Sequence, residues 1–221
     1  QAPSAPVLHV IDNGQSVALN MPRLRSLIES ACAGLGTDVQ AEPIVQETLR
    51  NLYDGVPLEE VHKAAILAAR TLIEKDPDYS FVTARLLLHT IAREVLGREV
   101  AQEDMAQAYA DYFPQCIRKG VENQLLDERL LQFDLTRLGA ALEAGRDLQF
   151  DYLGLQTLYD RYFLHVRKTR IELPQVFFMR VAMGLALGEI DREARAIEFY
   201  EVLSRFDFMS STPTLFNSGT L

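Results

Sequence analysis

The sequence predicts a mainly α-helical protein that opens with a β-hairpin. Two strand-like runs, Val7 to Asp12 and Gln15 to Asn20, flank Asn13-Gly14, a dipeptide that tolerates positive φ at both central positions of a type I′ turn. After the second run, apolar residues recur at three- and four-residue spacing in one segment after another, which is the period of amphipathic helices. We therefore expect one hairpin followed by helices.

The composition is that of an ordinary globular protein. Of the 221 residues, 48% are hydrophobic and 24% are charged. The formal net charge of -9 argues against a nucleic-acid partner, which needs a basic face, and mildly against a membrane surface. No run approaches the roughly 18 apolar residues of a membrane helix.

Cysteine usage indicates a reducing compartment. Cys32 and Cys116 are the two cysteines of the chain and belong to no C-x-x-C pattern, which excludes a zinc ribbon and makes a disulfide framework unexpected. We expect a cytoplasmic protein. Residues 1–6 have neither a basic start nor an apolar run, so we interpret them as a flexible leader rather than a signal peptide.

Four helices are expected after the hairpin, and together with it they form a domain at residues 7–98. Asn20 is a suitable N-cap for the first helix, which ends at Gly34 and Gly36. Asp38 is expected to cap the second helix, which Gly55-Val-Pro57 breaks. The third helix carries Val61 to Ile73, and the fourth carries Phe81 to Ile91 and ends near Gly97.

The second domain, residues 99–221, is expected to be all-helical. Its segment Pro174 to Leu187 is apolar nearly all round, which predicts a buried helix. Leu155 to Val166 is compatible with helix or strand. The aromatic cluster Tyr152, Tyr159, Tyr162 and Phe163 is interpreted as core rather than as a stacking platform. The remaining expected helices are Met105 to Lys119, bent or interrupted at Pro114, then Leu125 to Gln132, Leu135 to Glu143 and Asp191 to Phe206, before a turn-rich run at Ser210 to Gly219.

Two parts of the chain resemble the large subunit of class I ribonucleotide reductase. The run Ser211-Thr-Pro-Thr-Leu-Phe-Asn-Ser-Gly219, together with Pro174-Gln175 and Met179 to Ala182, resembles that subunit just before its first barrel strand. The hairpin and four helices resemble the ATP-cone at the N-terminus of such subunits. The resemblance implies a degenerate ATP-cone-like domain followed by the helical N-terminal domain, truncated before the ten-stranded α/β barrel.

The resemblance also implies a function for the full-length subunit. Such subunits reduce ribonucleoside diphosphates to deoxyribonucleoside diphosphates with a radical supplied by a small (beta) subunit, and ATP and dATP are their allosteric effectors. Their catalytic cysteines lie in the barrel, and neither Cys32 nor Cys116 matches them, so no catalytic residue and no activity are expected of this fragment. Thr212 and Thr214 match the stretch that contacts the substrate diphosphate; the alternative is that they brace a loop.

The cone-like domain departs from the nucleotide-binding pattern. Functional cones read Val-x-Lys-Arg-Asp-Gly, with a Glu three residues beyond the glycine; here the three charged positions are Ile11, Asp12 and Val17. A triphosphate would meet an added carboxylate in place of two cations. Each such change is worth a few kcal/mol at an effective dielectric near 20, and ~1.4 kcal/mol is already tenfold in affinity. We therefore expect a structural spacer that does not bind ATP or dATP.

Three residues match effector-site positions of the family and would form a vestigial site. They are Asn20, Arg23 and His62. Structural interpretations compete with this one and are favoured: Asn20 as an N-cap, Arg23 as a surface charge and His62 as a packed helix residue. No metal site is expected, because Glu59 and His62 make a single E-x-x-H where a di-metal helical site needs two.

One alternative to the enzyme fragment is a regulatory or scaffold module that binds adenine nucleotides or protein partners. The cone-bearing transcriptional repressor of reductase genes is dismissed, since it needs a four-cysteine zinc ribbon and a basic face. A plain helical scaffold does not need the hydroxyl-rich run at Ser211 to Gly219. No cofactor is expected in the fragment, and the expected oligomeric state is a monomer or a weak association.

Overall fold

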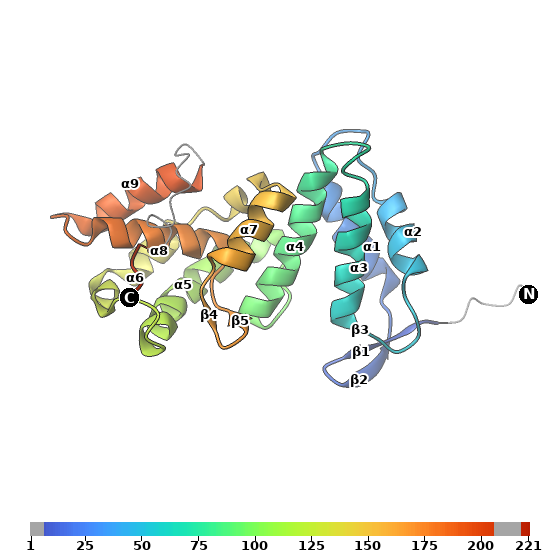
Figure 1. Cartoon of the computed structure of the whole chain (residues 1–221), viewed down its shortest axis with the longest axis horizontal. Helices are drawn as coiled ribbons and strands as arrows, with labels where there is room; N and C mark the ends of the chain where they lie inside the picture. Colours follow the sequence, from blue (N-terminus) through green and yellow to red (C-terminus); the bar gives the residue numbers. More distant parts are fainter. Residues whose placement is uncertain (1–6, 206–217) are drawn as a thin grey trace, which may run out of the picture. The chain divides into compact units, whose positions relative to one another are not determined.

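The computed structural model describes residues 7–205 and 218–221, and its fold is mainly α, as the sequence predicts (Figure 1). The chain divides into two compact units: residues 1–90 with 151–153, and residues 91–150 with 154–221. The division falls inside the long helix α4 (Tyr79–Leu96). No helix in the described part is long and apolar enough to cross a membrane.

The expected hairpin is confirmed in the first unit, but the sheet has a third strand. β1 (His9–Asp12) and β2 (Gln15–Ala18) pair antiparallel, and Asn13 and Gly14 have φ of 50° and 77°. β3 (Val56–Pro57) pairs parallel with β1, with Val10 opposite Val56. The expectation of a simple helix break at residues 55–57 is therefore incomplete, because a strand of two residues is too short to show a period.

Three helices and the first part of a fourth, α4, complete the first unit, and the strands lie at one end of α1 and α3 (Figure 1). The Asn20 side chain caps α1 by accepting a hydrogen bond from the backbone N of Arg23 at 3.1 Å. The expected Asp38 cap is wrong: α2 begins at Glu42 without a side-chain cap, and the Asp38 carbonyl accepts a hydrogen bond from the Tyr79 hydroxyl. The helices are α1 (Met21–Cys32), α2 (Glu42–Arg50), α3 (Leu58–Thr71) and α4 (Tyr79–Leu96).

The second unit is built around α5 (Met105–Glu122), α8 (Pro174–Ala186) and α9 (Arg192–Ser204). α8 is buried almost throughout, as expected, and it packs along α9 (Figure 1). The other elements are η1 (Gln102–Asp104), η2 (Glu128–Gln132), α6 (Leu135–Ala140), η3 (Ala144–Gln149), α7 (Tyr152–Arg161), β4 (His165–Val166) and β5 (Thr169–Arg170).

Several expectations for this unit need correction. The segment 125–132 is not an α-helix: only a 3-10 turn forms there, because Leu126 makes a β-bridge to Thr220. The segment 155–166 contains both helix and strand, since α7 ends at Arg161 and β4 then pairs antiparallel with β5. Of the aromatic residues 152, 159, 162 and 163, only Phe163 is fully buried.

Pro114 does not interrupt α5. The helix continues through it to Glu122, although proline cannot donate a hydrogen bond to the carbonyl of Ala110. Gly139 of α6 lies over this same turn: a Cβ at Gly139 would be 3.1 Å from the Ala110 oxygen. The close packing of α6 on α5 therefore depends on a glycine.

Candidate functional site

The carboxyl edge of the β1–β3 pair is acidic. β1 ends at Asp12, and β3, parallel to it, leads directly into the first turn of α3, which carries Glu59 and Glu60. The two positions that the resemblance assigns to phosphate-binding cations are Ile11, opposite Pro57, and Asp12 itself. An anionic ligand approaching this edge would meet carboxylates.

The three residues of the expected vestigial site each have a role within their own element. Asn20 caps α1, and the exposed Arg23 lies in the first turn of that helix. His62 lies within α3 with 8% of its surface exposed, and its ring meets the His89 ring edge-on at a centroid distance of 5.0 Å. These placements favour the structural interpretation of all three.

Thr212 and Thr214 lie outside the described residues. Among residues 7–205 and 218–221, no three His, Cys, Asp or Glu side chains come together in a way that could hold a metal ion.

The second unit contains a buried polar network that the sequence did not reveal. The carboxyl of Asp147 in η3 accepts hydrogen bonds from the Tyr109 hydroxyl at 2.8 Å and from Gln175 Nε2 at 2.7 Å. The Tyr200 hydroxyl donates to Gln175 Oε1 at 2.6 Å and accepts from the backbone N of Glu143 at 2.8 Å. The network joins α5, η3, α8 and α9 inside the second unit.

Burial dominates the electrostatics of this network. It raises the pKa of Asp147 to about 7, although the hydrogen bonds from Gln175 and Tyr109 oppose the shift. Burial also raises the pKa of Tyr200 to about 12 and that of Tyr109 well above its ordinary value. The tyrosines are therefore neutral hydrogen-bonding groups near neutral pH, and Asp147 is the member of the network that titrates there.

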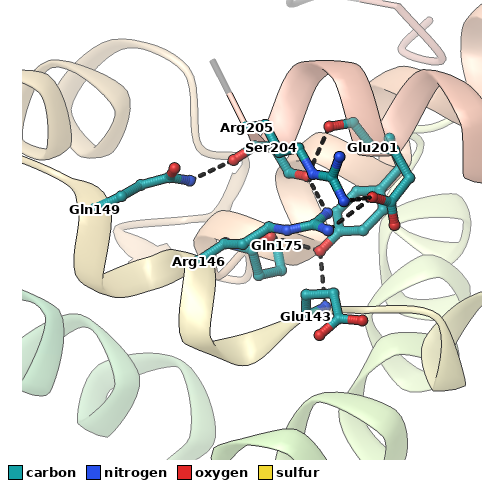
Figure 2. Close-up of polar contacts among 8 residues, drawn as sticks. Glu143, Arg146, Gln149, Gln175, Glu201, Ser204 and Arg205 are labelled. Carbon is teal, nitrogen blue, oxygen red and sulfur yellow. Dashed lines mark hydrogen bonds and ion pairs between the residues drawn. The ribbon is translucent and has the colours of Figure 1, made fainter. Parts of the chain in front are cut away.

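A second polar cluster surrounds the last turn of α9 (Figure 2). Arg146 of η3 donates to Ser204 Oγ through Nη1 and to Glu201 Oε2 through Nη2, each at 2.7 Å. Gln149 donates to the Ser204 carbonyl, and Arg205 pairs with Glu201 at 3.0 Å. Figure 2 shows that Arg146 and Gln149 reach this turn from the same side, so η3 holds the end of α9 at residues 201–205.

A buried ion pair holds the described C-terminal residues. Arg180 and Glu172 are 0% and 1% exposed, and they form two hydrogen bonds, at 2.9 and 3.0 Å. A third nitrogen of Arg180 donates to the Ser218 carbonyl at 3.2 Å. A Cβ at Gly184, one turn along α8, would lie 2.2 Å from both Gly219 N and Ser218 Oγ, so residues 218–219 press directly on the helix backbone.

The sequence carried one signal for this pair. α8 is apolar nearly all round except for Gln175 and Arg180. Because an arginine is almost never fully buried without a partner, its position in such a helix could have predicted a buried acid. Nothing comparable pointed to Arg146, Gln149 or Ser204, whose contacts join elements about 55 residues apart in the chain.

Both thiols are unsuited to redox chemistry in this structure. Burial raises the pKa of Cys32 to about 11, and the nearby Arg85 only partly opposes it. Burial also raises the pKa of Cys116, whose Sγ lies 3.1 Å from the Ile171 carbonyl. Since the thiolate is the reactive form, neither cysteine is a ready nucleophile at neutral pH.

Comparison with known proteins identifies the class of domain first. Residues 148–221, which include α8 and α9, match the family model of the ribonucleotide reductase all-alpha domain. The whole chain is 43% identical over 220 residues to the alpha subunit of ribonucleoside-diphosphate reductase from Chlamydia muridarum. It is 36% identical over 210 residues to the alpha subunit from Helicobacter pylori, and 33% identical over 218 residues to the large subunit from Danio rerio.

These alignments cover 99%, 94% and 96% of this chain, and 21%, 26% and 26% of the relatives. The chain belongs to the ribonucleoside-diphosphate reductase large subunits, as an N-terminal segment of one. It spans about a fifth to a quarter of the length of the curated relatives it matches.

Proposed function

We propose that this chain is the helical entry segment of a subunit that reduces ribonucleoside diphosphates to deoxyribonucleoside diphosphates for DNA synthesis. The observation that carries the proposal is the similarity to reductase alpha subunits along 99% of the chain. The partners of the full subunit are then the substrate and a radical-generating small subunit. The segment itself is a monomer or a weak oligomer.

The segment alone is catalytically inactive. Reduction by a thiol requires a cysteine that can react, and here one thiol is half-buried and the other is fully buried. Both have raised pKa values, which lowers the thiolate fraction at neutral pH. The chemistry of the subunit therefore belongs to other parts of its chain.

The hairpin domain is a structural module that does not bind ATP or dATP. Asp12 stands at one of the two positions where the family pattern has a cation, and Glu59 and Glu60 follow β3 at the same edge of the sheet. A triphosphate carries about three to four negative charges at neutral pH, and each close carboxylate opposes its binding by an amount on the order of 1 kcal/mol or more. ATP and dATP control of the full enzyme then resides at another site.

Calorimetric titration of the 221-residue chain with ATP and dATP tests this part of the proposal. We expect no saturable heat at micromolar nucleotide. The matched control is the triple variant Ile11→Lys, Asp12→Arg, Val17→Glu, which restores the family pattern on the same scaffold and is expected to gain binding. Saturable micromolar binding by the unmodified chain would refute the proposal.

Thr212 and Thr214 are proposed to contact the diphosphate of the substrate, because small hydroxyl and backbone donors suit a phosphate group. In the full-length subunit, assayed with its small subunit, Thr212→Ala is expected to raise the KM for ribonucleoside diphosphates about tenfold. An unchanged KM would show that the threonine only braces the chain.

A further inference from the structure

A hollow lies on the surface of the second unit, lined by residues of α5, of η2 and of the first turn of α6. Its volume is about 480 Å³. Two apolar lining residues, Phe133 and Leu135, are buried, and a third, Leu131, is 42% exposed. The other lining residues are polar and exposed, so the hollow is a surface depression rather than an enclosed cavity. A depression of this kind accepts a side chain from another protein surface more readily than it encloses a small molecule.

The same unit presents an apolar side chain that projects into solvent. Ile190 lies in the turn between α8 and α9 and is 105% exposed, the largest value among the large hydrophobic residues that the structure describes (Figure 1). The turn is short, because α8 ends at Ala186 and α9 begins at Arg192. Ile190 is therefore carried by a backbone that two packed helices hold in place.

This turn and the hollow are neighbours. Arg192, two residues after Ile190, places its guanidinium 4.8 Å from the centre of the Phe133 ring, and the next residue, Glu193, accepts a hydrogen bond from the backbone N of Asp134 at 3.1 Å. Phe133 and Asp134 both line the hollow. The start of α9 is thus fixed beside it, yet Ile190 does not fill the hollow of its own chain, because its side chain is fully exposed.

The charges around the two features also fit one another. Arg118 lines the hollow, is exposed, and forms no ion pair within residues 7–205 and 218–221. Ile190 is flanked by two exposed acids, Glu189 and Asp191. Glu122, one turn after Arg118, also lines the hollow and would repel these acids. The apolar contact is therefore the main contribution to binding, and the ionic one is modest.

From this arrangement we infer that a second copy of this chain binds at the hollow, with Ile190 of each copy entering the hollow of the other. Because the projecting side chain and the hollow are neighbours on one unit, a twofold axis between two copies forms both contacts at once. Arg118 of one copy then faces Glu189 and Asp191 of the other. This dimer goes beyond the proposed function, which allows either a monomer or a weak oligomer.

The expected dimer is weak. One apolar side chain and a polar rim, counted twice, bury an area near the lower limit of specific interfaces, which is about 1,200 Å². A rigid interface of this size, with partly opposed charges, is compatible with a Kd of roughly 10–100 μM. Every substitution in the interface acts twice in each dimer, because the two contacts are equivalent.

Sedimentation equilibrium of the 221-residue chain from about 10 μM to 1 mM tests the inference. The unmodified chain should show a monomer–dimer equilibrium. Ile190→Ser removes the projecting side chain and Leu131→Ser removes an apolar residue of the hollow, so each should weaken the dimer at least about tenfold. The control is Leu67→Ser, which removes a 56% exposed leucine from α3 in the first unit and should leave the Kd unchanged.

Mixing the two variants separates a contact between copies from an effect within one chain. A dimer of Ile190→Ser with Leu131→Ser regains one intact contact, since the remaining isoleucine meets the remaining complete hollow. The mixture should therefore associate more tightly than either variant alone, and melting curves by circular dichroism should show that both variants keep the fold of the unmodified chain.

Three results would overturn the inference and leave the proposed function intact. The first is a chain that stays monomeric up to about 1 mM, and the second is a dimer that Ile190→Ser does not weaken. The third is a mixture of the two variants that associates no more tightly than each does alone. Growth of the assembly beyond a dimer would also overturn it, because a twofold contact closes on itself.

Discussion

Replacing Asp147 by asparagine should remove a pH dependence from the stability of the chain. Asp147 is fully buried, and the two groups that contact its carboxyl oxygens are the Tyr109 hydroxyl and the Gln175 amide. An asparagine has the same shape and resembles the protonated acid. Gln175 can still donate to its oxygen, and the Tyr109 hydroxyl can accept from its amide nitrogen.

The magnitude follows from the pKa of this group. Its ordinary value is 3.8, and burial raises it to about 7, so the folded state holds the proton more tightly than the unfolded chain. The contribution of Asp147 to the free energy of unfolding is therefore greatest below about pH 4 and is lost as the pH rises through about 7. One pKa unit corresponds to about 1.4 kcal/mol, so ionisation of Asp147 should lower the free energy of unfolding by about 2.5 kcal/mol as the pH is raised from 5 to 8.

The assay is urea unfolding of the 221-residue chain and of Asp147→Asn at several pH values, followed by circular dichroism. The difference in unfolding free energy between the two proteins isolates residue 147, because the contributions of all other groups cancel. Asp147→Asn should become the more stable protein, relative to the unmodified chain, as the pH rises. The control is Asp104→Asn, the same change at an exposed residue at the start of α5.

A difference that stays constant from pH 5 to pH 8 would refute this reasoning. So would carboxyl-carbon NMR that places the titration of Asp147 near pH 4. Either result would mean that the hydrogen bonds from Tyr109 and Gln175 outweigh the burial of the charge.

Two further substitutions test the packing and the capping. Gly184→Ala should destabilise the chain by about 1–3 kcal/mol in thermal unfolding, because its Cβ would meet the backbone N of Gly219. The control Gly120→Ala should cost clearly less, because its Cβ would meet only the side chain of Leu126. Equal effects of the two substitutions would contradict the assigned contacts. Asn20→Ala should lower the free energy of unfolding by about 1 kcal/mol, because α1 loses its N-cap. Asn20→Asp keeps the oxygen acceptor and should recover most of this loss. An Asn20→Ala variant as stable as the unmodified chain would mean that the cap is dispensable.

Local chemistry made the first unit largely predictable from the sequence. Asn13-Gly14 determined the hairpin, and Asn20 followed by Pro22 marked the start of α1, because both signals act within four residues. Asp38 misled for the same reason: it has the chemistry of a cap, but it lies in a turn three residues before the N-cap position of α2, which starts at Glu42 without a side-chain cap.

The polar centre of the second unit was not predictable in this way. The burial of α8 followed from its composition, but the partners of Gln175 and Arg180 are Asp147, Tyr109, Tyr200 and Glu172. Of these, only Glu172 is near in sequence. The other contacts depend on how helices pack, and a single sequence has no period or spacing that encodes them.

The seam between α5 and α6 shows what two supposed helix breakers can do together. Pro114 of α5 has no amide hydrogen to donate to the Ala110 carbonyl, and Gly139 of α6 has no side chain. The two features meet at the Ala110 carbonyl: Pro114 leaves it without the usual amide donor, and Gly139, with no side chain, lets α6 pass close to it. Each residue taken alone would be expected to weaken its helix, whereas here α5 continues through Pro114 and the glycine of α6 permits close packing on that same turn.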